Sequence, residues 1–406
     1  MSSPRRAAPS TLGAALALAL AAAVALGLAR FSYALLLPPM RDDLGWSYLT
    51  AGAMNTVNAL GYLLGALLLP KALARFDARR VLLLGSAGAG LLLAGHGWVT
   101  SDNALFALRG ATGMASAAAF VAGGLLAARL VALPGAAPPA AAASSAPLRS
   151  AGLVLGIYYG GTGLGIIASA LLVPPLVARV APHAWQAAWI ALGLLALAAT
   201  AVTATFTAHL SVPRIAAPVH VAMPWARFGH GLAGYFLFGL GYIGYMTFVV
   251  TLLREQQMPD GQIMAFYVAL GAAVIASSWL WAGLLQRCRG GEPLSLLNAL
   301  LALATVLPVI STRPVAVFAS GLLFGAVFLS VVASTTALVR HNLPPAAWAG
   351  GIAAFTTVFA AGQIVGPSLV GWVADGPGGL MRGFVVSALV LAAGSLLAWR
   401  QKPLVH

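Results

Sequence analysis

The chain has 406 residues, of which 61% are hydrophobic and only 7% are charged. A soluble domain carries roughly 25% charged residues, so this composition excludes an ordinary soluble protein. The formal net charge of +14 is also compatible with a nucleic-acid binder. The positions of the basic residues along the chain distinguish such a binder from a membrane protein.

Twelve apolar stretches follow one another through the chain, each long enough to cross a bilayer. A helix needs about 20 apolar residues to cross about 30 Å of hydrocarbon, and such long runs satisfy their backbone hydrogen bonds in lipid as helices. We therefore predict an all-α polytopic membrane protein with 12 transmembrane helices. The expected spans are 12–37, 49–70, 80–99, 104–130, 151–178, 185–207, 228–253, 262–286, 293–311, 315–339, 346–373 and 383–399.

Basic residues gather on one side of these spans. If the N-terminus is cytoplasmic, the cytoplasmic segments hold 15 Lys and Arg and the outer loops hold five. This asymmetry is the positive-inside rule, so we expect both termini in the cytoplasm and no nucleic-acid partner. Twenty of the 22 basic residues are Arg, a usage typical of a GC-rich bacterial genome. We expect a multi-pass protein of the bacterial cytoplasmic (inner) membrane.

The first span begins like a secretory signal, but its apolar run continues past Leu28 and is too long for one. Arg30 lies inside this span, where a charge costs about 2.5–3.5 kcal/mol on insertion scales. One explanation is snorkelling to the outer interface near Pro38. We favour the other, an anion-binding group that faces a wet cavity, with Tyr33 on the same helix face.

The second span carries a polar stripe, Asn55, Asn58 and Tyr62, on an otherwise apolar helix. In lipid such a stripe must face protein or water, so we expect substrate-binding residues here. Interhelical hydrogen bonding is the alternative.

Arg109 is a second arginine inside a span, and it can pair structurally with neighbouring carbonyl groups.

The fifth span offers Tyr158 as a lining residue and a GxGxxA match at Gly163. A dinucleotide site needs that pattern on a strand-to-helix turn. Here the pattern lies in the middle of a predicted helix, where small residues indicate close helix packing. We therefore expect no cofactor.

The hydrophilic break 208–227 is interpreted as a cytoplasmic central loop that divides the chain into two six-helix bundles, 1–207 and 228–406. A weak repeat supports the division: GLARFSY begins at Gly27, and GLGYIGY begins at Gly239 at the equivalent place. A site between two such repeats is a known transporter plan. We add Tyr242 and Tyr245 from the second repeat to the expected substrate-binding residues.

The eleventh span carries Gln363 as a further candidate for substrate binding, and Gly366 with Pro367 can break the helix beyond it.

All eight acidic residues fall in loops or at span ends, so the sequence shows no buried carboxylate of the kind that many proton-coupled transporters use. Coupling through His96, through a protonated substrate or through anion exchange stays open. The chain has no HExxH, GxSxG or P-loop motif and a single cysteine, so we expect neither an enzyme nor a metal site.

Several motifs together resemble the major facilitator superfamily. They are RFSYALLLP in the first span, Arg109 with Gly113 in the fourth, YYGGTGLGI in the fifth and GQIVGP in the eleventh. The likeness covers nearly the whole chain and points to a bacterial branch of largely uncharacterised permeases. It implies the fold of that superfamily, and for Arg109 a role in coupling or conformational change.

The family's signature loop after the second span is degraded here. The segment that matches it keeps Arg79 and Arg80, but its aspartate position is Arg75 and Asp77 lies two residues late. The resemblance implies a conformational role for Asp77, Arg79 and Arg80, while plain positive-inside charge is the alternative.

The organophosphate–phosphate exchangers of the superfamily similarly have an arginine before the helix-one proline. That resemblance implies a clamp of two arginines, but the position of the second one here is Tyr242. A single arginine suits a monoanionic carboxylate better than a dianionic phosphate.

We therefore expect a monomeric secondary transporter that works in the lipid bilayer by alternating access on a small anionic organic solute. The alternatives are a multidrug or metabolite efflux permease of the same fold, a polytopic membrane enzyme, or a sensor.

Overall fold

The computed structural model describes residues 11–131, 146–178, 181–210 and 225–404. Twelve of its helical segments are long and apolar enough to cross a membrane, which confirms the predicted fold class. The elements are α1 Thr11–Ala22, η1 Ala23–Phe31, α2 Tyr33–Leu44, α3 Tyr48–Arg75, α4 Ala78–Gly95, η2 His96–Trp98, α5 Asp102–Val131, α6 Ala146–Val177, α7 Trp185–Phe206, η4 Trp225–Phe228, α8 Gly229–Glu255, α9 Asp260–Leu280, α10 Ala282–Arg287, α11 Glu292–Ile310, α12 Pro314–Asn342, η5 Pro345–Ala347, α13 Trp348–Ala374 and α14 Gly379–Trp399.

The first and the eleventh span differ from their predicted course at a proline. The first span consists of α1, η1 and α2, and it continues past the predicted end at residue 37, through Pro38 and Pro39, to Leu44. It stops at Gly45, whose φ of +67° is the left-handed conformation that closes many helices. α13 runs unbroken through Pro367, because one proline removes only one hydrogen bond and neighbouring helices can hold the helix in line.

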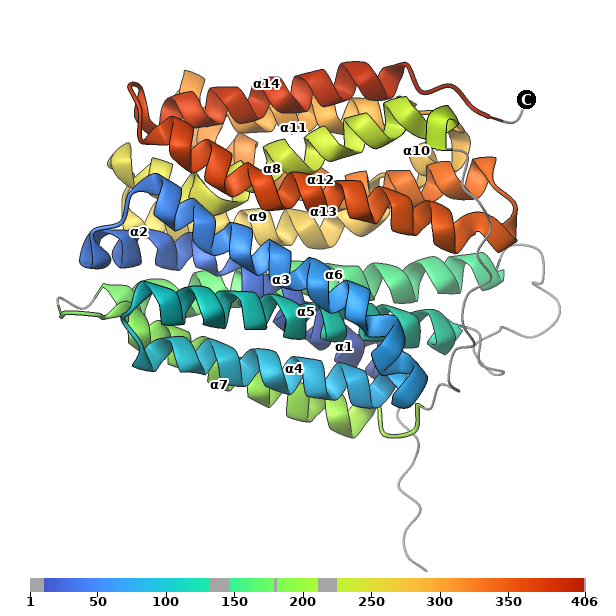
Figure 1. Ribbon diagram of the computed structural model, residues 1–406, viewed down its shortest axis with the longest axis horizontal. Coiled ribbons are helices and arrows are strands. Elements are labelled where there is room, and N and C mark those ends of the chain that lie inside the picture. The colour runs from blue at the N-terminus through green and yellow to red at the C-terminus, as the bar shows by residue number, and fades with distance from the viewer. Residues whose placement is uncertain (1–10, 132–145, 179–180, 211–224, 405–406) are drawn as a thin grey trace, which may run out of the picture.

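The helices form two groups that lie side by side (Figure 1). α1 to α7 pack mainly against one another, and so do α8 to α14. We call them the N-terminal half and the C-terminal half. The predicted boundaries at 207 and 228 stay a prediction, and most of the central loop, residues 211–224, lies outside the described residues.

The two halves meet along α3 against α13 and α6 against α9. At both contacts the backbones approach so closely that only glycine fits. A Cβ on Gly52 would lie 2.2 Å from the Pro367 carbonyl oxygen, and one on Gly163 would lie 2.3 Å from that of Gly271. Gly163 begins the GxGxxA match, which therefore serves helix packing.

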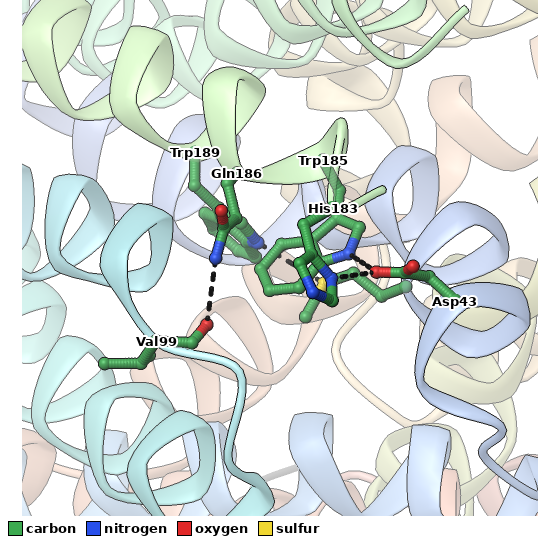
Figure 2. A network of polar contacts seen from close by, with 7 residues as sticks. Asp43, Val99, His183, Trp185, Gln186 and Trp189 are labelled. Carbon is green, nitrogen blue, oxygen red and sulfur yellow. Dashed lines mark hydrogen bonds and ion pairs between the residues drawn. The ribbon is translucent and has the colours of Figure 1, made fainter. Parts of the chain in front are cut away.

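Because the number of spans is even, the first and last described residues lie at the same end of the bundle, which we call the terminal end. At the opposite end the N-terminal half is tied together by Asp43. Its carboxylate accepts hydrogen bonds from Trp185 Nε1 at 2.6 Å and from His183 Nδ1 at 2.5 Å (Figure 2). The end of α2 is thereby fixed to the start of α7.

Candidate functional site

Arg30 lies in the middle of the first span, within the π-helical segment η1. Such wide turns are rare and occur frequently at functional sites. The side chain is 4% exposed, and its Nη2 donates to Gln363 Oε1 of α13 at 2.5 Å. Its Nε has no hydrogen-bond partner among the described residues. A buried cation of the N-terminal half is thus held by one amide of the C-terminal half.

Gln363 extends this contact to a third helix. Its Nε2 donates to the Tyr242 hydroxyl of α8 at 2.8 Å. The Arg30 guanidinium also lies 6.0 Å from the centre of the Tyr62 ring on α3. We call Arg30, Gln363, Tyr242 and Tyr62 the central cluster; it draws on four spans from both halves.

Aromatic rings surround the cluster on the side of the C-terminal half. The Tyr242 ring stacks on Phe238, Phe359 and Phe328 with centroid distances of 4.6, 5.8 and 6.0 Å. Phe31, next to Arg30, meets Phe328 edge-on at 5.7 Å. The polar groups of the cluster therefore lie beside a group of stacked aromatic rings.

Arg109 on α5 is buried nearby, with 1% of its surface exposed. Its Nη1 donates to the Ala29 carbonyl oxygen at 3.0 Å, and its Nη2 donates to Asn55 Oδ1 at 2.9 Å. The guanidinium lies 4.7 Å from the centre of the Tyr33 ring. Asn55 in turn donates to Thr247 Oγ1 of α8 at 2.7 Å, so this network also joins the two halves.

Neither arginine has an acidic partner. The four ion pairs in the described part of the chain all involve other residues. A buried charge without a countercharge is costly, and hydrogen bonds to neutral groups compensate only part of that cost. Arg30 has one hydrogen-bonded partner, a side-chain amide that can be displaced, and a buried Nε without a partner among the described residues, so a bound anion would supply both a countercharge and acceptors.

The structure places the predicted substrate-binding residues in three groups. Arg30, Tyr62, Tyr242 and Gln363 form the central cluster. Tyr33 and Asn55 contact Arg109 instead, and the side-chain amide of Asn58 donates to the Arg109 carbonyl oxygen at 3.0 Å.

Two predicted lining tyrosines are buried and make packing contacts. The Tyr158 hydroxyl donates to the Phe120 carbonyl oxygen. The Tyr245 hydroxyl pairs with Ser320 Oγ at 2.7 Å, and its ring stacks on Phe324 at 4.0 Å.

The residues of the degraded signature loop lie at the terminal end and make local contacts. Asp77 precedes α4 and accepts a hydrogen bond from the Arg80 backbone N–H at 3.0 Å. The Arg80 side chain pairs with the same carboxylate at 3.3 Å. Arg79 Nη2 donates to the Ala204 carbonyl oxygen near the end of α7 at 2.7 Å. All these partners belong to the N-terminal half.

Sequence reasoning missed Thr247, Phe328 and Phe359. Phe359 precedes Gln363 by one helical turn, so the helix period from Gln363 places both on one face and would have found it. No comparable signal marks Phe328, because an apolar residue in an apolar span has no pattern of its own.

The comparisons with known proteins agree on the fold. A family model described as "Uncharacterised MFS-type transporter YbfB" matches residues 22–399, and no curated protein matches the chain. A solved mutant of nucleoside transporter NupG has a TM-score of 0.71 and 14% identity, over 95% of this chain and 98% of that one. A bacterial homologue of the human lysosomal transporter Spinster, inward-facing and unoccupied, has a TM-score of 0.69 and 13% identity, over 97% of both chains. At such identities the likeness to the solved structures shows the fold alone.

Proposed function

Since the chain belongs to the family of MFS-type transporters whose model it matches over residues 22–399, we propose that it is a secondary transporter of a small anionic organic solute. We propose further that it works by alternating access in the bacterial inner membrane, as a monomer, with Arg30 as the main recognition group. The fold and the family carry the transport part of this proposal. The anionic substrate rests on the central cluster.

The observation that carries the choice of an anion is the position of Arg30. Its charge is buried between the two halves, and its hydrogen-bonded partner there is the neutral side chain of Gln363. In a medium of lowered dielectric an anion attracts a guanidinium far more strongly than it does in water. The solute's oxygen would replace Gln363 Oε1 at Nη2, and Gln363 could then donate its amide N–H groups to the same anion.

The distribution of contacts between the halves supports alternating access. At the end opposite the termini, Asp375 follows α13 and accepts hydrogen bonds from the backbone N–H groups of Tyr48 and Leu49, at 2.7 and 2.9 Å. The Tyr48 hydroxyl also donates to Glu255. Among the described residues, no hydrogen bond joins the halves from the terminal part of α3, 63–75, or of α13, 348–358. We interpret this as a conformation closed at the outer end.

The test is uptake of radiolabelled organic anions, cations and neutral solutes into proteoliposomes. We expect anions to be transported, and Arg30→Gln to abolish transport while the protein still folds. Arg382→Gln is the matched control, because Arg382 is an exposed arginine at the opposite end and its loss should change nothing. Transport of cations alone, or normal transport by Arg30→Gln, would refute the anionic substrate but not the transporter fold.

The chain contains its own probe of orientation. Cys288 is the single cysteine and is partly exposed between α10 and α11 at the terminal end. A membrane-impermeant maleimide should label it in inside-out vesicles and not in intact cells. Labelling in intact cells would overturn the proposed cytoplasmic location of both termini.

A further inference from the structure

The two donor atoms on one side of the Arg30 guanidinium indicate which class of anion can bind there. Nε and Nη2 form one side of the planar guanidinium, the side on which a carboxylate binds with two parallel hydrogen bonds. Nε has no partner in the described structure, and Nη2 is held by a side-chain amide that can rotate away. One carboxylate can therefore occupy both positions, with one oxygen on Nε and the other in place of Gln363 Oε1.

The charge available at this edge is a single positive one. Both Nη atoms of Arg109 already donate a hydrogen bond, to the Ala29 carbonyl oxygen and to Asn55 Oδ1, whereas its Nε, like that of Arg30, has no partner among the described residues. The remaining polar groups of the central cluster, Gln363 and the Tyr242 hydroxyl, are neutral donors and acceptors. One carboxylate matches this set, and a second negative charge would have no partner.

Flat aromatic faces lie directly beside the polar edge. The rings of Phe238, Phe328 and Phe359 lie within 19°, 13° and 18° of the plane of the Tyr242 ring. Phe359 is only partly buried, although it stacks on Tyr242. On the side of the N-terminal half, Tyr62 is partly buried. Partly exposed rings from both halves thus flank the place where the rest of the solute must lie.

We infer that the solute is an aromatic monocarboxylate, bound by its carboxylate to the Nε–Nη2 edge of Arg30 and by its ring against Phe359 and Tyr242. This inference rests on the proposed function and narrows it. An offset-stacked ring gains about 0.5–1.5 kcal/mol beyond its buried area, and these rings already stand in parallel planes.

The test compares four probes by isothermal titration calorimetry on the purified full-length protein: benzoate, cyclohexanecarboxylate, phthalate and benzamide. They share a six-membered ring and differ in planarity and charge. We expect benzoate to bind best and cyclohexanecarboxylate about three- to tenfold more weakly. Phthalate should also bind more weakly than benzoate, and benzamide should not bind measurably.

The variant Phe359→Leu removes the ring and keeps an apolar side chain. It should weaken benzoate about three- to tenfold and leave cyclohexanecarboxylate unchanged. Phe318→Leu is the matched control, because Phe318 is also partly buried but packs edge-on against Phe266; it should affect neither probe.

The outcomes separate the two proposals. Equal affinity for benzoate and cyclohexanecarboxylate, or an equal loss of both in Phe359→Leu, overturns the aromatic ligand and leaves an anion transporter. Tighter binding of phthalate than of benzoate overturns the single-carboxylate match. Binding of benzamide with benzoate's affinity overturns the anionic substrate itself. Binding of none of the four probes overturns the aromatic monocarboxylate and leaves other anions to the uptake assay.

Discussion

Arg30 and Arg109 are two arginines buried in the same membrane-embedded region, and their surroundings differ. Arg109 is held by a backbone carbonyl, by Asn55 and by the face of Tyr33. Arg30 donates to one side chain, Gln363, which belongs to the other half of the molecule, and lies 6.0 Å from the centre of the Tyr62 ring. A group held by backbone atoms of its own half moves with that half. A group held by one rotatable amide across the interface can exchange that partner for a ligand.

The comparison shows that burial of a charge does not by itself indicate function. Both residues are arginines buried inside a predicted span. What separates them is the number of fixed partners, and this depends on how the helices are placed. Arg109 connects α5 to η1 and α3, and Arg30, with its single hydrogen-bonded partner, is the residue that we propose as the binding group.

The largest effect is expected for Arg109→Gln. The substitution leaves the Ala29 carbonyl oxygen and Asn55 Oδ1 without their donor, and each unsatisfied buried polar group costs about 1–3 kcal/mol. The melting temperature of the purified protein should fall clearly. Arg30→Gln, the matched substitution, should leave it nearly unchanged, because the loss of one hydrogen bond is offset by relief of an uncompensated buried charge. Equal destabilisation by the two changes would remove the distinction between the residues.

A smaller effect is expected for Arg30→Lys. Lysine keeps the positive charge but loses the planar pair of donors, so a carboxylate can no longer bind at two positions. Affinity for the transported anion should fall about 10- to 150-fold, since a charge-assisted hydrogen bond contributes about 1.5–3 kcal/mol. Binding isotherms of the two proteins measure this directly. Unchanged affinity would mean that only the charge of Arg30 matters.

The sequence predicts the fold well and the site only in part, for the same physical reason. Twelve apolar runs and the charge asymmetry are properties of the chain alone, and the bilayer requires helices of that length. The sequence also singles out Arg30, because a charged residue inside an apolar span can be recognised without knowing which residues surround it in the fold. The partners of a buried polar group do depend on them. Tyr33 follows Arg30 by three residues, yet it packs against Arg109 because the chain passes through the end of the π-helical segment between them.

A moderate effect is expected for Thr247→Val, which tests the link between Arg109 and the C-terminal half. Valine keeps the shape of threonine but cannot accept the hydrogen bond from Asn55 Nδ2. The loss of one buried hydrogen bond costs about 0.5–1.5 kcal/mol. Because this bond joins the halves, the cost should fall on the conformation seen here. In a Cys288→Ser background, a cysteine introduced at Thr251, which is buried near the end of α8 opposite the termini, should react faster with a maleimide. An unchanged rate would mean that Asn55 acts within its own half.

The smallest effect is expected for Asn58→Leu, which separates two explanations of the polar stripe on α3. The side-chain amide of Asn58 donates to the Arg109 carbonyl oxygen, so its loss should lower stability by about 1 kcal/mol through α5. If Asn58 acts only through this bond, the affinity for a transported anion stays unchanged. If Asn58 also lines the substrate path, the affinity falls. The control is Thr100→Leu, at an exposed position beside the fourth span, which should change neither stability nor affinity. Melting temperature and binding affinity measured together on both variants decide between these results. A loss of affinity without a loss of stability would place Asn58 with Arg30 among the binding residues, and the reverse would place it with Arg109.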